Sequence, residues 1–187
     1  MPGRNPYEAF GAFVSPLASA LSCVATTKMT TSPGGKKEMN TVHTLFVTGP
    51  GNIDGYLRLR GPAGLEMSAR LFYEIIRDSR DGYGPYRVTT RGYEYSLRTA
   101  DGCAVIGYHW HPLGNSHVTV PHLHLGATQL RPNAILTGKG HYPTGRITFE
   151  AVVKSAIDHG AEPVRDDWDA RLAETELRHL QHRTWGG

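Results

Sequence analysis

Two residues near the middle of the chain, Asp101 and Gly102, constrain its fold more than any other feature. They separate two segments, Tyr86–Thr99 and Cys103–His111, in which apolar and polar residues alternate as in half-buried strands. Asp-Gly is among the strongest short signals for a two-residue β-hairpin, because both central residues of a type I′ turn need a positive φ. The sequence therefore predicts an antiparallel hairpin here.

A two-residue turn would also fix which residues face each other across the hairpin. Tyr93 is expected opposite Trp110, and Glu94 opposite His109. The face that carries the aromatic pair is apolar and suits a core; its members are Tyr93, Tyr95, Leu97, Ile106, Tyr108 and Trp110. The other face, with Glu94 and His109, is polar and is therefore the candidate for a functional site.

Histidines are unusually frequent after this hairpin. The chain has 10 His against 5 Phe, and five of the ten lie between residues 109 and 124. The segment 117–129 is a third strand candidate, and alternate residues of neighbouring strands project to a common face. If this strand pairs with the second one, four histidines share the face of Glu94: His109, His111, His122 and His124. Gly92 and Gly107 would leave room beside them for a ligand.

The two ends of the chain are predicted to be helical. A short helix is expected over Tyr7–Val14, and Pro16 suits the start of a second helical piece. Residues 26–40 are rich in Gly, Ser and Thr and are expected to form a flexible linker. Residues 1–40 are thus predicted to be a helical appendage plus linker, and residues 41–187 a single α+β domain.

Helices are also predicted within this domain. One is expected over Met67–Arg77 from its apolar spacing, after a glycine-rich turn at residues 49–55. Another would begin after an N-cap at Thr148 and end at Gly160, and a third would open at Glu162-Pro163. The predicted fold class is α+β: a twisted, mainly antiparallel sheet of about five strands with helices on its apolar face.

Composition limits the class of protein. The chain has 187 residues, 39% of them hydrophobic and 20% charged, which is a globular balance. Two cysteines exclude a disulfide framework and a four-cysteine zinc site. No apolar run reaches the ~18 residues that a transmembrane helix needs. Glu8 and Pro16 interrupt the N-terminal apolar tract, unlike a signal peptide, so a cytoplasmic location is expected.

The central part of the chain resembles a known family. The stretch Arg91–Leu125 combines Tyr93-Glu94-Tyr95, a hairpin, a strand bearing aromatic residues and histidines, and Pro121-His122-Leu123-His124, and a terminal helix follows. In this combination it resembles the TumE-like toxin components of bacterial toxin–antitoxin systems. The resemblance implies a toxin-like activity on RNA or nucleotides and an antitoxin-like protein partner, and it assigns no residue roles.

The histidine-bearing face allows two chemistries. In the first, the four histidines and Glu94 carry out acid–base catalysis on a phosphate ester, as in a nuclease, because imidazole titrates near neutral pH. Substrate phosphates would then be bound by Arg91, Arg98 or Arg131. In the second, His109, His111, His122 and His124 bind a divalent transition metal such as Zn, Ni, Fe or Cu, which assists hydrolysis.

Two alternatives to a hydrolase stay open. One is a non-catalytic module that binds a metal or ligand through the same histidines. The other is an interaction protein that uses the basic end of its last helix, where Arg178, His179, His182 and Arg183 cluster. His117 and His141 are expected in loops, from which either could close over the site.

Overall fold

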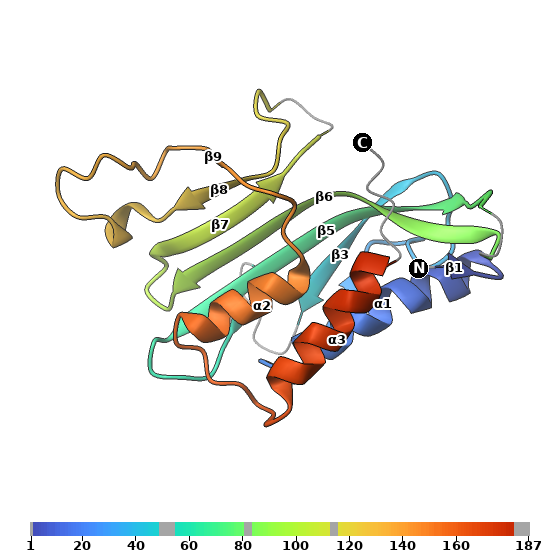
Figure 1. Cartoon of the computed structure of the whole chain (residues 1–187), viewed down its shortest axis with the longest axis horizontal. Coiled ribbons are helices and arrows are strands. Elements are labelled where there is room, and N and C mark those ends of the chain that lie inside the picture. Colours follow the sequence, from blue (N-terminus) through green and yellow to red (C-terminus); the bar gives the residue numbers. More distant parts are fainter. Residues whose placement is uncertain (1, 49–54, 81–83, 113–115, 182–187) are drawn as a thin grey trace.

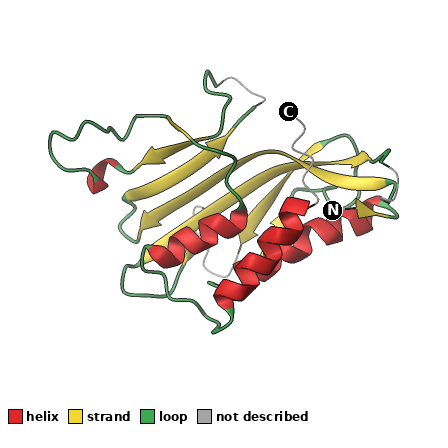
Figure 2. Cartoon of the chain, in the orientation of Figure 1, coloured by secondary structure: helices red, strands yellow, loops and turns green. Residues whose placement is uncertain are grey.

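A computed structural model describes residues 2–48, 55–80, 84–112 and 116–181. Three α-helices lie on one side of a nine-stranded antiparallel sheet (Figures 1 and 2). The helices are α1 (Pro6–Leu21), α2 (Phe149–Asp158) and α3 (Trp168–Gln181). The strands are β1 (Pro2–Gly3), β2 (Lys28–Thr31), β3 (Val42–Thr48), β4 (Leu57–Arg58), β5 (Leu65–Arg77), β6 (Tyr86–Thr99), β7 (Ala104–Trp110), β8 (His122–Leu125) and β9 (Tyr142–Pro143).

The sheet follows the order β2-β3-β5-β6-β7-β8-β9, with β1 paired to β6 and β4 paired to β5. The α+β class, the antiparallel sheet and the helical N-terminal element are therefore confirmed. The strand count was underestimated at about five, because β1, β4 and β9 have only two residues each. Such short strands leave no alternating pattern in a sequence.

The segment Met67–Arg77 is a strand and not the predicted helix. Met67, Leu71 and Ile75 are four residues apart, a spacing that fits one helix face and equally one face of a strand. Burial alternates strictly along β5, and every second residue from Leu65 to Ile75 is buried. Leu71 lies between β3 and β6, paired with Leu45 and Tyr93. The period is therefore two, and β5 is a central strand of the sheet.

The core lies between the sheet and the helices. Its largest fully buried side chains include Tyr73, Tyr93, Tyr95, Phe149 and Leu17. Helix α1 contributes Phe13 and Leu17 to the same core as the sheet, so residues on both sides of position 40 share it. The helix runs unbroken through Pro16, and β2 forms within the tract expected to be a linker.

The central hairpin has the predicted register but a different turn. Tyr93 pairs with Trp110 and Glu94 with His109. Gly102 adopts a φ of +86°, whereas Asp101 does not adopt a positive φ, so the turn is not type I′. The Gly102 N–H donates to the Thr99 carbonyl and the Thr99 N–H to the Cys103 carbonyl, which closes a three-residue loop. The register shifts by one position beyond Leu97, as this extra residue requires.

Several other boundaries differ from the prediction. Strand β8 covers only His122–Leu125 of the predicted segment 117–129, because Pro121 precedes it and a 3₁₀ turn at Ala127–Gln129 follows. Helix α2 begins after its N-cap Thr148, as predicted, and Gly160 follows with a φ of +102°. Helix α3 begins at Trp168 and not at Glu162-Pro163. The turn expected over residues 49–55 lies, except for Gly55, outside the described residues.

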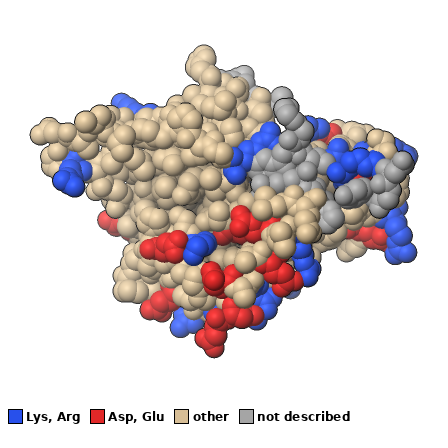
Figure 3. Space-filling view, viewed as in Figure 1, with Lys and Arg blue, Asp and Glu red and all other residues tan. Residues whose placement is uncertain are grey.

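No helix among the described residues has the length and apolar character needed to cross a membrane. Figure 3 shows that Asp and Glu side chains gather over α2 and α3, whereas few charged side chains lie over β7, β8 and β9.

Candidate metal centre

The register of the sheet arranges polar side chains in two rows across β5, β6, β7 and β8. Directly paired residues of antiparallel strands project to the same face, here the face opposite the helices. One row consists of Arg70, Glu94, His109 and His122. The adjacent row consists of Ser68, Ser96, Gly107 and His124. A cation, a carboxylate, hydroxyls and imidazoles therefore lie within one small area of the sheet.

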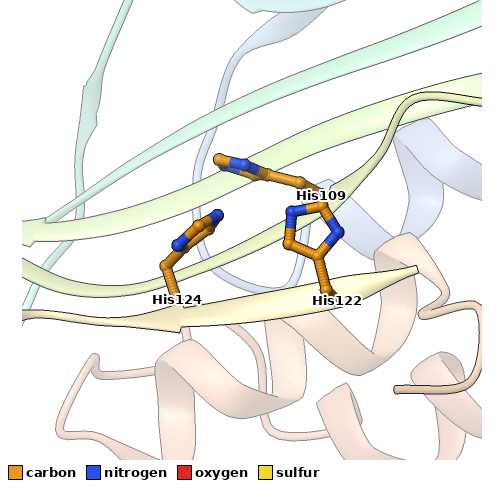
Figure 4. A group of neighbouring side chains, drawn as sticks. All are labelled: His109, His122 and His124. Carbon is orange, nitrogen blue, oxygen red and sulfur yellow. The ribbon is translucent and has the colours of Figure 1, made fainter. Parts of the chain in front are cut away.

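Three imidazoles converge where β7 meets β8. His109, His122 and His124 each offer a ring nitrogen that lies within 4.8 Å of those of the other two. Figure 4 shows that His122 and His124 project from β8 towards the side on which His109 leaves β7. The ring centroids of His124 are 4.8 Å from His109 and 5.0 Å from His122. Of the four predicted metal ligands, these three could hold one ion. We refer to His109, His122 and His124 as the triad.

A fourth imidazole closes in from the loop before β9. The ring centroid of His141 lies 4.9 Å from His122 and 4.5 Å from His124. Strand β9 places it there, since Pro143 pairs with His122. The sequence left His141 open as a loop residue that could close over the site, and the structure confirms this position. It lies across the triad from Glu94, on the side of the sheet edge.

His111 lies at the border of the triad and not within it. Its ring centroid is 5.6 Å from that of His109, and its Nε2 is 3.6 Å from Glu94 Oε1. Glu94 Oε2 is in turn 3.5 Å from Arg70 Nη1. The Glu94 carboxylate thus faces His109 across the strands, as predicted, but its close contacts are with His111 and Arg70.

The hydrogen bonds of His122 fix which of its nitrogens is available. Its Nδ1 lies 2.8 Å from the Val120 carbonyl oxygen. A carbonyl can only accept, so Nδ1 carries a proton and donates, which leaves Nε2 as the nitrogen that could bind a metal. A backbone carbonyl that orients a histidine in this way is typical of the outer shell of metal sites. The ring is also held by burial, with 3% of the residue exposed.

Burial and crowding favour the neutral imidazole. Burial lowers the pKa of His109 to about 4, and the neighbouring His124, His111, His122 and His141 contribute in that order. Burial also lowers the pKa of His124, followed by His141 and His122. These rings are therefore unprotonated at neutral pH. Neutral imidazole is the form that binds a metal ion, and removal of a competing proton favours that binding.

Glycine at position 107 keeps space open beside the triad. Gly107 pairs with both Ser96 and His124, and a Cβ added there would lie 3.3 Å from His109 Nε2. A side chain at this position would press on the His109 ring. This agrees with the predicted role of the glycine as a gap for close approach.

The three arginines proposed to bind substrate are not gathered at the triad. Arg91 Nη2 lies 2.5 Å from Glu74 Oε2, and Arg98 Nε lies 2.7 Å from Glu66 Oε2. Arg131 is exposed and lines a separate hollow formed by residues 129–136. Each of the first two is thus already paired with a carboxylate.

The cation that the structure does place near the triad is Arg70, which sequence reasoning missed. It lines a groove of about 380 Å³ on the same face of the sheet. The other lining residues are Tyr56, Ser68, Glu94, Ser96 and His109. The assignment of Met67–Arg77 to a helix hid Arg70, because its place in the row depends on the strand register.

The basic end of the last helix offers less than the sequence indicated. The Arg178 guanidinium contacts Glu174 one turn away, and His179 is buried, with 8% exposed. His182 and Arg183 lie outside the described residues. Of these two residues, only Arg178 is exposed to a partner, and the interaction surface stays a prediction.

Three imidazole nitrogens and an adjoining groove are the elements of a catalytic metal site, in which three protein ligands leave a further position open. A fourth imidazole from His141 would instead close the coordination shell. The chain matches no family model, no curated protein and no solved structure, so this geometry is what connects it to a function.

Proposed function

We propose that this chain is a metal-assisted hydrolase that acts on a phosphate-bearing substrate, RNA or a nucleotide. The observation that carries the proposal is the convergence of His109, His122 and His124, whose nitrogens lie within 4.8 Å of one another beside a polar groove. Imidazole ligands suit Zn, Ni, Cu or Fe. The resemblance of Arg91–Leu125 to the TumE-like toxins supports a nucleic-acid or nucleotide substrate.

Metal-assisted chemistry fits the site better than metal-free acid–base catalysis. A metal-free nuclease needs one imidazole to donate a proton while another accepts one. The lowered pKa values of His109 and His124 keep both rings neutral near pH 7, which removes them as proton donors. The same shift makes both rings good ligands.

Each part of the site then has a role. A bound divalent metal would supply a Lewis acid and would lower the pKa of a coordinated water. Glu94 lines the groove together with His109, which supports a role for its carboxylate in accepting a proton from the attacking water. His111 Nε2 lies 3.6 Å from one oxygen of that carboxylate, and Arg70 Nη1 lies 3.5 Å from the other.

The test is hydrolysis by protein that was purified without a histidine tag. Activity on bis(p-nitrophenyl) phosphate and on a short RNA is measured after chelation and after addition of each candidate metal. We expect activity only in the metal-loaded protein, and a loss of at least about 100-fold in His109→Ala, since removal of one ligand disrupts the site. His117→Ala is the matched control, because His117 is exposed. Full activity in the chelated protein would contradict metal assistance.

A second candidate function is a non-catalytic metal-binding module. The observation that favours it is the contact between His141 and His124, at 4.5 Å between ring centroids, which offers a fourth ligand. The His141→Ala variant separates the two candidates. If the centre is catalytic, the variant keeps at least part of the hydrolysis. If the centre is a closed binding site, the variant loses metal affinity, and wild type hydrolyses nothing.

A further inference from the structure

The groove beside His109 contains one arginine that is not firmly paired. The side chain of Arg70 is 51% exposed, and its Nη1 lies 3.5 Å from Glu94 Oε2, at the limit of a hydrogen bond. Arg98, on the same face, is held at 2.7 Å by Glu66. Within the described part of the chain, Arg70 makes no other ion pair. Most of its donors are therefore available to a ligand in the groove.

Two hydroxyl groups lie in the next row. Ser68 on β5 and Ser96 on β6 are directly paired, one row from Arg70 and on the same face. The Tyr56 hydroxyl donates to Ser96 Oγ at 3.1 Å, so the proton of Ser96 is free to be donated elsewhere. The Tyr56 ring is held in place by the Arg98 guanidinium, 3.7 Å from its centroid. The groove thus combines a guanidinium with the hydroxyl groups of Ser68 and Ser96, which suits an oxyanion.

The position of this groove relative to the triad limits the ligand. Arg70 on β5 and His109 on β7 line the same groove, and β6 lies between their strands. Glu94 lies between them and disfavours a negative charge at the midpoint.

We propose that Arg70, Ser68 and Ser96 form a subsite for a second phosphate of the substrate, while the reacting phosphate lies at the triad. The inference deepens the proposed function and rests on it for the identity of the reacting centre. The substrate class is then a molecule with at least two phosphates, a chemistry shared by nucleoside diphosphates and the RNA backbone. The second phosphate replaces the long contact of Arg70 with Glu94, because a guanidinium binds phosphate in a bidentate manner.

The subsite is tested in chelated protein with inorganic pyrophosphate as the probe. An NMR titration at low salt should shift the backbone amides of Ser68, Arg70 and Ser96. In Arg70→Met the dissociation constant should rise by roughly 10-fold to 100-fold, the usual effect of losing a charge-assisted hydrogen-bond donor. Arg178→Met, on α3 behind the sheet, removes the same charge and should bind as wild type does. Equal binding by Arg70→Met and wild type would overturn the subsite.

Two further arms separate this inference from the proposed function. Pyrophosphate binding is measured in chelated protein, so a dependence on Arg70 supports the subsite even if no metal is ever found. Metal-dependent hydrolysis together with unchanged pyrophosphate binding in Arg70→Met would overturn the subsite alone. Displacement of pyrophosphate by ADP assigns nucleotides, displacement by the dinucleotide pUpU assigns RNA, and displacement by neither contradicts the substrate class.

Discussion

His109 on β7 lies directly opposite His122 on β8, and their ring centroids are 5.7 Å apart. Their backbones are paired in the sheet, so the distance is set by hydrogen bonds of the two strands and not by a mobile loop. His124 reaches the same point because it is two residues further along β8 and projects to the same face. The triad is therefore a product of strand pairing, and changes in the strands should alter it in predictable ways.

Gly107→Val should weaken the metal site without weakening the fold. The new side chain begins 3.3 Å from His109 Nε2 and must displace that ring. We expect the metal dissociation constant to rise at least about 10-fold, as is usual when the support of a ligand is disturbed. Thermal stability should stay the same or increase, because glycine weakens a strand interior by about 0.5–1 kcal/mol. Gly145→Val, where an added Cβ meets nothing within 4 Å, is the control. Unchanged metal affinity in Gly107→Val would show that His109 is not a ligand.

The stability of the chelated protein should decrease as the pH falls from about 6.5 to about 4. The pKa of His109 is about 4 in the folded chain against 6.5 in a model peptide, so the unfolded chain binds the proton more readily. The contribution of neutral His109 to the free energy of unfolding is fully present above pH 6.5 and is lost as the pH falls towards 4. This contribution is at most about 3 kcal/mol, and it is smaller in practice because the half-buried ring is partly screened by solvent.

Urea unfolding at pH 5 and pH 7 in the presence of a chelator measures this loss. His109→Gln should show a smaller decrease between the two pH values than wild type, whereas the exposed His117→Gln should behave as wild type does. An identical decrease in wild type and His109→Gln would mean that other groups account for the pH dependence.

Gly102→Ala and Gly11→Ala should have opposite effects on stability. Gly102 closes the central hairpin with a φ of +86°, a conformation that costs a residue with a Cβ about 1–2 kcal/mol. Gly11 lies within α1, where an added Cβ meets nothing within 4 Å, so alanine should stabilise the chain by up to about 1 kcal/mol. Chemical denaturation of both variants checks the pair. Equal stability of Gly102→Ala and wild type would contradict the left-handed turn.

The sequence predicted the hairpin well because short-range patterns determine it. Alternation and the Asp-Gly signal were enough to pair Glu94 with His109 and Tyr93 with Trp110. The same local logic placed His122 and His124 on the face of His109. The turn type was wrong, since a three-residue loop with one left-handed glycine also suits an Asp-Gly pair.

Features that depend on distant strands could not be predicted. Arg70 reaches the site only because β5 pairs with β6, and its apolar neighbours at four-residue spacing fit a helix equally well. Arg91 and Arg98 have the residue type that binds phosphate. Their carboxylate partners Glu74 and Glu66 lie on β5, so these ion pairs could not be predicted while β5 was assigned to a helix. His141 approaches the triad through the pairing of β9 with β8, which involves two residues of each strand and leaves no sequence pattern.

The most direct test of the metal centre is the metal content of the chain, purified without a histidine tag and measured by inductively coupled plasma mass spectrometry. We predict about one transition-metal ion per chain in wild type and in His117→Ala, as for a site with three histidine ligands. We predict less than about a tenth of that in His122→Ala, because the loss of one of three ligand nitrogens strongly lowers metal affinity. Metal content that is negligible in wild type after incubation with Zn, Ni, Fe and Cu, or equal in wild type and His122→Ala, would contradict the metal centre.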